Sequence, residues 1–339
     1  MLRVAINGYG RIGRSVLRAL YENGYREHIQ VVAINELSDL ETISYLTRYD
    51  TTHGRFPMPV SIVDGCLQVG TDTIRCLSAT NPKNIDWQAL NIDMLFECSG
   101  SFSSRAEAEY YLSVGVPRML LSQPAAADVD ATIVFGFNQQ EIQAGQRIVS
   151  AASCTTNCII PVLDALQQLA GVEHGTTQTI HSAMNDQPVI DAYHTNDLRL
   201  TRSAISSIIP VDTGLSKGIQ RLLPELGDKI ACNAIRVPTI NVSVIDLVVR
   251  TKEVVTKEQV NHCFERLSLG KYQHLMGFTQ EPHASVDFNH DPRSVIVDGT
   301  QTQVVDGRLV KLLCWFNNEW GYANRTAELM RVVGLADQI

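Results

Sequence analysis

The chain has 339 residues, of which 45% are hydrophobic and 19% charged, and its formal net charge is −8 at pH 7. This length favours two domains, and the composition is that of a globular protein. The negative charge and the lack of any cluster of five or more basic residues argue against a nucleic-acid-binding surface. No run of 18 apolar residues occurs, so we expect no membrane-spanning segment.

The eight cysteines are scattered along the chain, at positions 66, 76, 98, 154, 158, 232, 263 and 314. Disulfide frameworks are dense in short secreted domains, so we expect these residues to be reduced thiols. The chain runs directly into an apolar strand, Val4 to Ile6, without a preceding leader pattern. We therefore expect a cytoplasmic protein.

Residues 1–152 alternate short apolar runs with stretches of helical spacing, which predicts parallel strands joined by crossover helices. Helices are expected at residues 11–22 and 105–114. Strands are expected at residues 3–7, 30–35, 94–98, 119–122, 132–135 and 147–151. This half of the chain is therefore expected to be an α/β domain with a Rossmann-type doubly wound parallel sheet.

After residue 170 the predicted strands become longer and alternate in polarity, notably at residues 241–249 and 304–316. Asp306-Gly307 divides the second of these runs and predicts a hairpin. Helical spacing returns at residues 323–335. We expect residues 153–318 to form an α+β domain with a mixed, largely antiparallel sheet.

The first predicted strand runs into Asn7-Gly8-Tyr9-Gly10-Arg11-Ile12-Gly13, which fits G-x-G-x-x-G at the start of a predicted helix. In a dinucleotide site Gly8 permits the tight turn, Gly10 lets the backbone approach a pyrophosphate, and Gly13 allows close helix–strand packing. The alternative is a turn that binds nothing.

Glu36 ends the second predicted strand, 23 positions beyond Gly13. A carboxylate near this spacing binds a ribose 2′-hydroxyl in dinucleotide-binding domains. Because a carboxylate repels a 2′-phosphate, Glu36 predicts NAD rather than NADP as the cofactor.

Ser153-Cys154-Thr155-Thr156-Asn157-Cys158 lies where an apolar strand-like run gives way to a helix-like one. Cys154 is therefore expected at a helix N-terminus, where unpaired N–H groups and the helix dipole favour the nucleophilic thiolate. The alternative is a buried thiol that only packs. We predict no metal site here, because Cys154 and Cys158 lack a second close Cys/His pair.

A dinucleotide site and a thiolate together suggest aldehyde oxidation, with a thioester intermediate on the cysteine. Such a thiolate needs a base, and we choose His181 from the nine histidines because it ends the strand-like run at residues 176–180. The sequence alone leaves open whether His181 meets Cys154, and a structural or surface histidine is the alternative.

Five separated motifs resemble those of the glyceraldehyde-3-phosphate dehydrogenase family, in the same order and over essentially the whole chain. They are N-G-Y-G-R-I-G at 7–13, A-S-C-T-T-N-C at 152–158, I-R-V-P-T at 235–239, N-V-S-V-I-D-L at 241–247 and N-N-E-W-G-Y at 317–322. The resemblance implies that Cys154 is the nucleophile and His181 its activator. It also implies a homotetramer, with the C-terminal segment 319–339 packed on an NAD-binding domain of residues 1–152.

The same resemblance implies further ligand contacts. Arg11 and Ile12 would line the NAD pyrophosphate, Ser122 would lie by the cofactor, and Asn318 would hold the nicotinamide carboxamide. A small phosphorylated aldehyde would be bound by Ser153, Thr155, Arg199, Thr213, Gly214 and Arg236. The family often has arginine where Leu200 stands, which leaves open whether Arg199 or Arg202 takes that role.

The chain departs from the family after His181. Where two phosphate-binding threonines are common, this chain has Met184 and Asp186. Methionine cannot donate a hydrogen bond, and the Asp186 carboxylate would repel an anion at close range. We therefore hypothesise that inorganic phosphate binds poorly and that water cleaves the thioester.

Residues 181–194 and 287–302 instead resemble the erythrose-4-phosphate dehydrogenase branch of the family. That resemblance implies oxidation of D-erythrose 4-phosphate to 4-phosphoerythronate with NAD and water, an early step toward pyridoxal phosphate (pyridoxine biosynthesis). A phosphorylating glyceraldehyde-3-phosphate dehydrogenase is the alternative. A non-catalytic NAD-binding module is a remote one, since Cys154 and His181 are both present.

Overall fold

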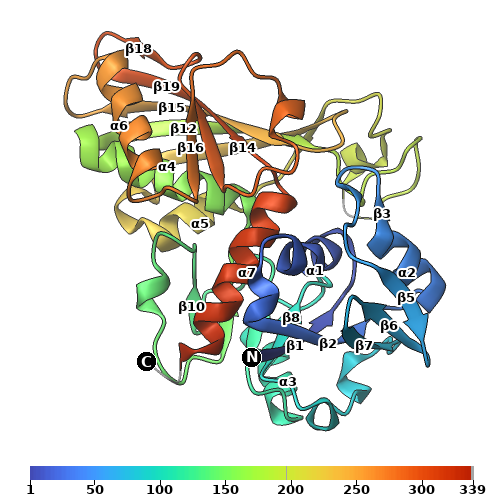
Figure 1. The fold of residues 1–339 in the computed structure, drawn as a ribbon. Helices are drawn as coiled ribbons and strands as arrows, with labels where there is room; N and C mark the ends of the chain where they lie inside the picture. The colour runs from blue at the N-terminus through green and yellow to red at the C-terminus, as the bar shows by residue number, and fades with distance from the viewer. Residues whose placement is uncertain (196, 337–339) are drawn as a thin grey trace. The chain divides into compact units, whose positions relative to one another are not determined.

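The structure is a computed structural model that describes residues 1–195 and 197–336. The chain divides into two compact units, one of Met1–Ser153 with the C-terminal segment from Ala323, the other of Cys154–Tyr322. Figure 1 colours the chain from blue at the N-terminus to red at the C-terminus.

The first unit is built on a nine-stranded sheet with the order β10-β11-β9-β8-β1-β2-β7-β6-β5. Pairing is parallel from β10 to β7 and antiparallel from β7 to β5. The strands are β1 (Leu2–Asn7), β2 (Ile29–Asn35), β5 (Val60–Val63), β6 (Cys66–Val69), β7 (Asp72–Leu77), β8 (Met94–Glu97), β9 (Met119–Leu121), β10 (Ala131–Thr132) and β11 (Ile148–Ser150). Strand β1 lies between β2 and β8 and pairs in parallel with both. The order in which strands are added to the sheet reverses at β1.

Helices α1 (Arg11–Glu22), α2 (Leu40–Arg48) and α3 (Arg105–Ser113) belong to the same unit. So does most of the C-terminal helix α7 (Trp320–Gly334), where the Arg118 guanidinium donates to the carbonyl of Val333 and the Asn23 amide donates to Asn324 Oδ1 at 2.5 Å. A two-stranded ribbon and several short 3-10 turns complete the unit: β3 (Tyr49–Asp50), β4 (Gly54–Arg55), Tyr25–Glu27, Pro82–Asn84, Gln88–Leu90 and Gln139–Glu141.

The predicted strand at residues 132–135 is wrong beyond Thr132. Gly136 takes a left-handed φ of 91°, and the chain turns, with the Phe137 N–H donating to the carbonyl of Val134 at 3.0 Å. The Asn138 side chain accepts from the Val134 N–H at 2.8 Å, which satisfies the backbone without a neighbouring strand. The apolar side chains of Ile133 and Val134 are buried, but their backbone belongs to a turn and not to the sheet.

The second unit holds an eight-stranded sheet with the order β13-β14-β12-β15-β19-β17-β16, and β18 pairs with β19. Only the β12–β14 and β16–β17 pairs are parallel. The strands are β12 (Val172–Ser182), β13 (Ile209–Val211), β14 (Ile230–Val237), β15 (Ser243–Thr251), β16 (Met276–Thr279), β17 (Val295–Asp298), β18 (Gln303–Val305) and β19 (Leu309–Phe316). The hairpin predicted at Asp306-Gly307 is confirmed, and both residues take positive φ angles, 51° and 65°.

Helix α4 (Cys154–Ala170) packs along this sheet and contacts β12, β15, β17 and β19. Helix α5 (Leu215–Leu222) and helix α6 (Lys257–Leu269) both contact α4, and short 3-10 turns lie at Leu198–Thr201, Pro224–Leu226 and Ser285–Phe288. The predicted fold class is confirmed by the parallel sheet of the first unit and the mixed sheet of the second. In the described part of the chain, no helix is long and apolar enough to span a membrane.

Candidate functional site

A hollow of about 360 Å³ opens at the carboxyl ends of β1, β2, β7 and β8. In doubly wound sheets ligands bind in this crevice, where the strand order reverses. Its lining residues are Asn7, Gly8, Gly10, Asn35, Glu36, Leu37, Ala79, Thr80, Pro82, Cys98, Ser99, Ser101 and Phe102. The structure therefore brings together three residues predicted from the sequence, Gly8, Gly10 and Glu36.

The glycine loop has the backbone geometry that its motif predicts. Gly8 has a φ of +89°, and a Cβ there would lie 2.6 Å from the backbone of Ser99. A Cβ on Gly13 would lie 2.5 Å from the carbonyl oxygen of Gly8, so α1 packs closely on its own strand. A Cβ on Gly10 would meet nothing within 4 Å, which leaves open space where a pyrophosphate can approach the backbone.

Glu36 faces the same loop. Its carboxylate accepts the N–H of Tyr9 at 2.9 Å and the N–H of Leu37 at 2.8 Å. Each carboxylate oxygen can accept more than one hydrogen bond, so both retain capacity for ribose hydroxyls. The donor set and the open space at Gly10 fit an adenine dinucleotide.

Arg11, Ile12, Gly13 and Ser122 are not among the residues that line this hollow. Arg11 begins α1, and its guanidinium forms an ion pair with Asp50. Burial alone raises the pKa of Asp50, but hydrogen bonds from Arg11 and from the backbone N–H groups of His53 and Thr52 outweigh it and lower the pKa to about 2. Arg11 thus brings its side chain to Asp50, so any contact with a pyrophosphate falls to its backbone.

Sequence reasoning missed a buried polar network beneath the hollow. The Asn7 amide donates to Glu97 at 2.5 Å, the Asn35 amide donates to Asn7 at 2.8 Å, and the Ser99 N–H donates to Glu97 at 2.8 Å. Burial raises the pKa of Glu97. The network ties the ends of β1, β2 and β8 together, and the signal for it was an Asn or Glu as the last residue of each of these strands.

The second unit brings the predicted nucleophile and base together. Helix α4 begins at Cys154, as predicted, directly after a turn in which Ala152 has a φ of 56°. His181 lies at the end of β12, and its Nε2 is 3.9 Å from Cys154 Sγ. His181 Nδ1 lies 2.7 Å from the carbonyl oxygen of Ser182. This carbonyl can only accept, so Nδ1 carries the proton and Nε2 of the neutral ring faces the thiol as an acceptor.

The resting protonation state differs from the sequence-based expectation. Burial raises the pKa of the Cys154 thiol to about 11, although the backbone N–H groups of residues 155 and 154 act in the opposite direction. Burial likewise lowers the pKa of His181, and the Ser182 carbonyl opposes that shift. Burial is the larger influence, so the helix N-terminus alone does not favour the thiolate of Cys154 at pH 7. The raised pKa of the thiol and the lowered pKa of the imidazole both favour the neutral groups, and the imidazole can take the thiol proton.

The neighbour of His181 on the adjacent strand is fixed by the register of the sheet. Strands β12 and β14 pair in parallel, and His181 lies opposite Arg236. The Arg236 guanidinium forms an ion pair with Asp186 at 2.5 Å, and its side chain is only 12% exposed. Met184, the other departure after the histidine, is 46% exposed. The register of two strands thus places a cation and a carboxylate beside the base.

The remaining predicted substrate residues lie in loops and at helix starts. Thr213 and Gly214 precede α5, and Thr213 Oγ1 accepts the Leu215 N–H at 3.2 Å. The Arg202 side chain forms an exposed ion pair with Asp191 at 2.8 Å. Within residues 1–195 and 197–336 the exposed Arg199 guanidinium has no ion-pair partner.

Residues beside the nucleophile complete the predicted set. Ser153 and Thr155 flank Cys154, and both are partly exposed. Asn318 follows β19 and accepts hydrogen bonds from the hydroxyls of Ser182 and Ser243, both at 3.0 Å. Neither serine was predicted.

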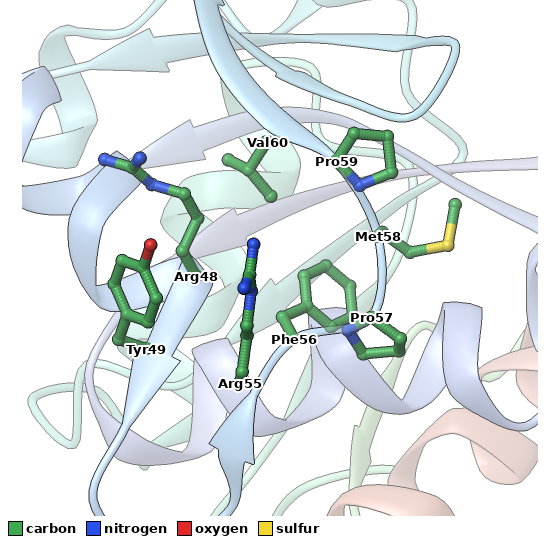
Figure 2. Close-up of a pocket in the computed structure, with 8 residues that line it drawn as sticks. All are labelled: Arg48, Tyr49, Arg55, Phe56, Pro57, Met58, Pro59 and Val60. Atoms are coloured by element: carbon green, nitrogen blue, oxygen red, sulfur yellow. The ribbon is translucent and has the colours of Figure 1, made fainter.

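A second hollow, of about 540 Å³, lies in the first unit and is shown in Figure 2. Arg48, Tyr49, Arg55 and Phe56 line it together with the apolar segment 57–60. It contains neither a thiol nor an imidazole nor a carboxylate among its lining residues, so it offers no nucleophile or base. All eight cysteines of the chain are free thiols. The described residues include no group of three His, Cys, Asp or Glu side chains that could hold a metal ion.

Comparison with protein families agrees with this geometry. Residues 2–105 match the family model described as glyceraldehyde 3-phosphate dehydrogenase, NAD binding domain. Residues 153–318 match the model described as glyceraldehyde 3-phosphate dehydrogenase, C-terminal domain. The prediction of NAD as cofactor is confirmed, and the first match contains the whole glycine loop and Glu36.

Proposed function

Since the chain belongs to the glyceraldehyde-3-phosphate dehydrogenase family, we propose that it oxidises D-erythrose 4-phosphate to 4-phosphoerythronate and that water releases the product. Members of this family are NAD-dependent dehydrogenases of phosphorylated aldehydes. The particular sugar and the acyl acceptor are the parts that we propose. The proposal includes the role of this product as a precursor of pyridoxal phosphate.

The chemistry follows from the Cys154–His181 pair. Cys154 Sγ attacks the aldehyde carbon while His181 Nε2 takes the thiol proton and passes it to the carbonyl oxygen, which gives a hemithioacetal. Bound NAD would supply the hydride acceptor for this carbon. His181 then takes the hydroxyl proton, and a thioester remains on Cys154. Water adds to the thioester carbon, the C–S bond breaks, and the carboxylic acid and the Cys154 thiol are released.

The observation that carries the proposal is the Arg236–Asp186 ion pair beside the base. Arginine is the residue best suited to hold phosphate oxygens, because its planar fork stays charged. Here Asp186 pairs with one nitrogen of that fork and adds a negative charge next to it. A small free anion therefore finds a weaker site than an unpaired arginine would offer, which favours water as the acyl acceptor.

We propose that the phosphate of the sugar is held by Arg199, Thr213 and Gly214, with Ser153 and Thr155 beside the reacting carbon. Arg199 is favoured over Arg202 because Arg202 already forms an ion pair with Asp191. The backbone at the start of α5 presents N–H groups, and the N-terminal end of a helix carries partial positive charge.

The test compares initial rates of NADH formation on D-erythrose 4-phosphate and on glyceraldehyde 3-phosphate, each with and without inorganic phosphate. We expect turnover of erythrose 4-phosphate that does not require phosphate. Faster, phosphate-dependent turnover of glyceraldehyde 3-phosphate would instead identify a phosphorylating enzyme. Absence of NADH with both sugars, from protein that binds NAD, would favour the non-catalytic alternative.

We also propose that the protein is a homotetramer. Support comes from a set of large apolar side chains that are exposed in the single chain on the segment after His181, with Tyr193 and Leu198 among the most exposed. The set is Val189, Ile190, Tyr193, Leu198, Ile205 and Ile208. Six large apolar side chains exposed on one segment are typical of a surface that binds another protein chain. Light scattering coupled to size exclusion should give four times the 37.5 kDa chain mass, and a monomer would contradict the proposal.

A further inference from the structure

Three buried side chains form a hydrogen-bonded group where β12, β15 and the end of β19 meet. The hydroxyls of Ser182 and Ser243 each donate to Asn318 Oδ1 at 3.0 Å. The backbone N–H of Ser182 donates to Ser243 Oγ at 3.0 Å. Ser182 and Ser243 are 1% exposed and Asn318 is 9% exposed, so this group is largely shielded from water.

These bonds determine that the oxygen of the Asn318 amide, and not its NH2 group, faces the two serines. Ser182 and Ser243 each have one hydroxyl proton, and the only acceptor that the described residues offer to either is Asn318 Oδ1. If the amide were reversed, two buried hydroxyl protons would have no acceptor, which is costly in a site shielded from water. The oxygen of the amide is therefore held by the serines, and its NH2 group is left to donate elsewhere.

We propose that Ser182 and Ser243 are positioning residues that hold Asn318 as a hydrogen-bond donor to the carbonyl oxygen of the nicotinamide carboxamide. The proposal rests on the assignment of Asn318 to the nicotinamide, which belongs to the proposed function. It adds a direction: Asn318 recognises the carbonyl oxygen and not the NH2 group of the cofactor.

Ser182 has a second role through its backbone. Its carbonyl accepts from His181 Nδ1 at 2.7 Å, while its hydroxyl holds Asn318. One residue thus orients both the base and the group that contacts the nicotinamide. Replacement by alanine removes the hydroxyl and leaves the backbone carbonyl, so the effect on Asn318 can be measured without disturbing His181.

The test is calorimetric binding of NAD and of ADP-ribose, which lacks the nicotinamide, to the full chain and to Ser182→Ala and Ser243→Ala. We expect each variant to bind NAD about threefold to tenfold more weakly, as for loss of one hydrogen bond, and to bind ADP-ribose as before. Equal weakening of both ligands would show a structural role only. Ser294→Ala is the matched control, because that buried serine hydroxyl has no hydrogen-bond partner in the described chain.

Two further measurements test whether the serines act through Asn318 and which group of the carboxamide Asn318 binds. In an Asn318→Ala background the two serine substitutions should have no additional effect on NAD binding, and an undiminished effect would overturn the proposal. The 3-acetylpyridine analogue of NAD keeps the carbonyl but lacks the NH2 group, so Ser182→Ala should weaken it as much as NAD. Retained affinity for the analogue would contradict the proposed direction. None of these readouts depends on which sugar is oxidised.

Discussion

At the scale of single residues, we expect the reactivity of Cys154 to depend on His181. A thiol with a pKa of about 11 is ionised in roughly one molecule in 10⁴ at pH 7. The neutral imidazole at 3.9 Å removes the proton as the thiol reacts, so the pair can work without a resting thiolate. Burial raises the pKa of the Cys154 thiol and lowers the pKa of the His181 imidazole, so it favours the neutral form of both groups.

His181→Asn is therefore expected to lower turnover by roughly 10²- to 10⁴-fold, which is the usual contribution of a general base. Alkylation of Cys154 by iodoacetamide in this variant should rise about tenfold per pH unit from pH 7 to 10, because only the free thiolate reacts. In the unmodified chain, turnover should fall as the pH drops below the lowered pKa of His181. Alkylation of the variant that levels off near pH 8 would contradict the raised pKa of the thiol.

Asp186 provides a second prediction at this scale. Asp186→Thr should increase phosphate-dependent turnover several-fold, because it frees the Arg236 fork and restores a hydroxyl donor. Asp186→Asn is the matched variant, which removes the charge without adding a hydroxyl, and it should give a smaller increase. Phosphate dependence unchanged in both variants would rule out the charge-based account.

At the scale of elements, two glycines in the turn between β1 and α1 have different roles: Gly8 matters for folding and Gly10 for ligand binding. Gly8 needs its positive φ and has no room for a Cβ, whereas Gly10 has room in the protein alone. Gly8→Ala should destabilise the first unit by about 1–3 kcal/mol through backbone strain. Gly10→Ala should leave stability nearly unchanged and weaken NAD binding, because the methyl group enters the space that the pyrophosphate needs.

Thermal unfolding and NAD titration of the two glycine variants check this distinction. A Gly10→Ala variant that binds NAD normally would show that the pyrophosphate does not approach the loop at that residue. A Gly8→Ala variant with unchanged stability would show that the turn relaxes at little cost.

The elements also show how far sequence reasoning reached. Fully buried parallel strands such as β8 and the first turn of α4 at Cys154 were predictable, because burial on both faces and a strand-to-helix change leave clear local patterns. The Arg236–Asp186 pair was not, because it depends on the register of β12 and β14, two segments far apart in the chain. The Ser182–Ser243–Asn318 group was missed for the same reason.

At the scale of the whole molecule, acid sensitivity is concentrated in the first unit. Three carboxyls there combine a lowered pKa with an arginine partner, namely Asp50, Asp72 and Asp130. A lowered pKa means that the stabilisation is fully present above the unfolded pKa near 4 and is lost as the pH falls through the folded value. For Asp50, whose side chain is 8% exposed, the contribution at neutral pH is about 2 kcal/mol.

Asp50→Asn should therefore lower the unfolding free energy by about 2 kcal/mol at pH 7 and by little near pH 2. Urea unfolding at both pH values measures this difference. Hydrogen exchange at pH 3 should show loss of protection in the first unit before the second. A deficit in Asp50→Asn that is equally large at pH 2 would mean that lost packing, rather than lost charge, is responsible.

The parallel pairing of β12 and β14 has an evolutionary consequence. Eight consecutive residue pairs fix the distance between the base and the arginine, so that neither can shift without unpairing the sheet. In the function that we propose, the residues that distinguish one sugar phosphate from another lie instead in the segment that follows β12. Substrate preference can therefore diverge by substitutions in that segment while the catalytic pair stays in place, and engineering of new specificities should begin there.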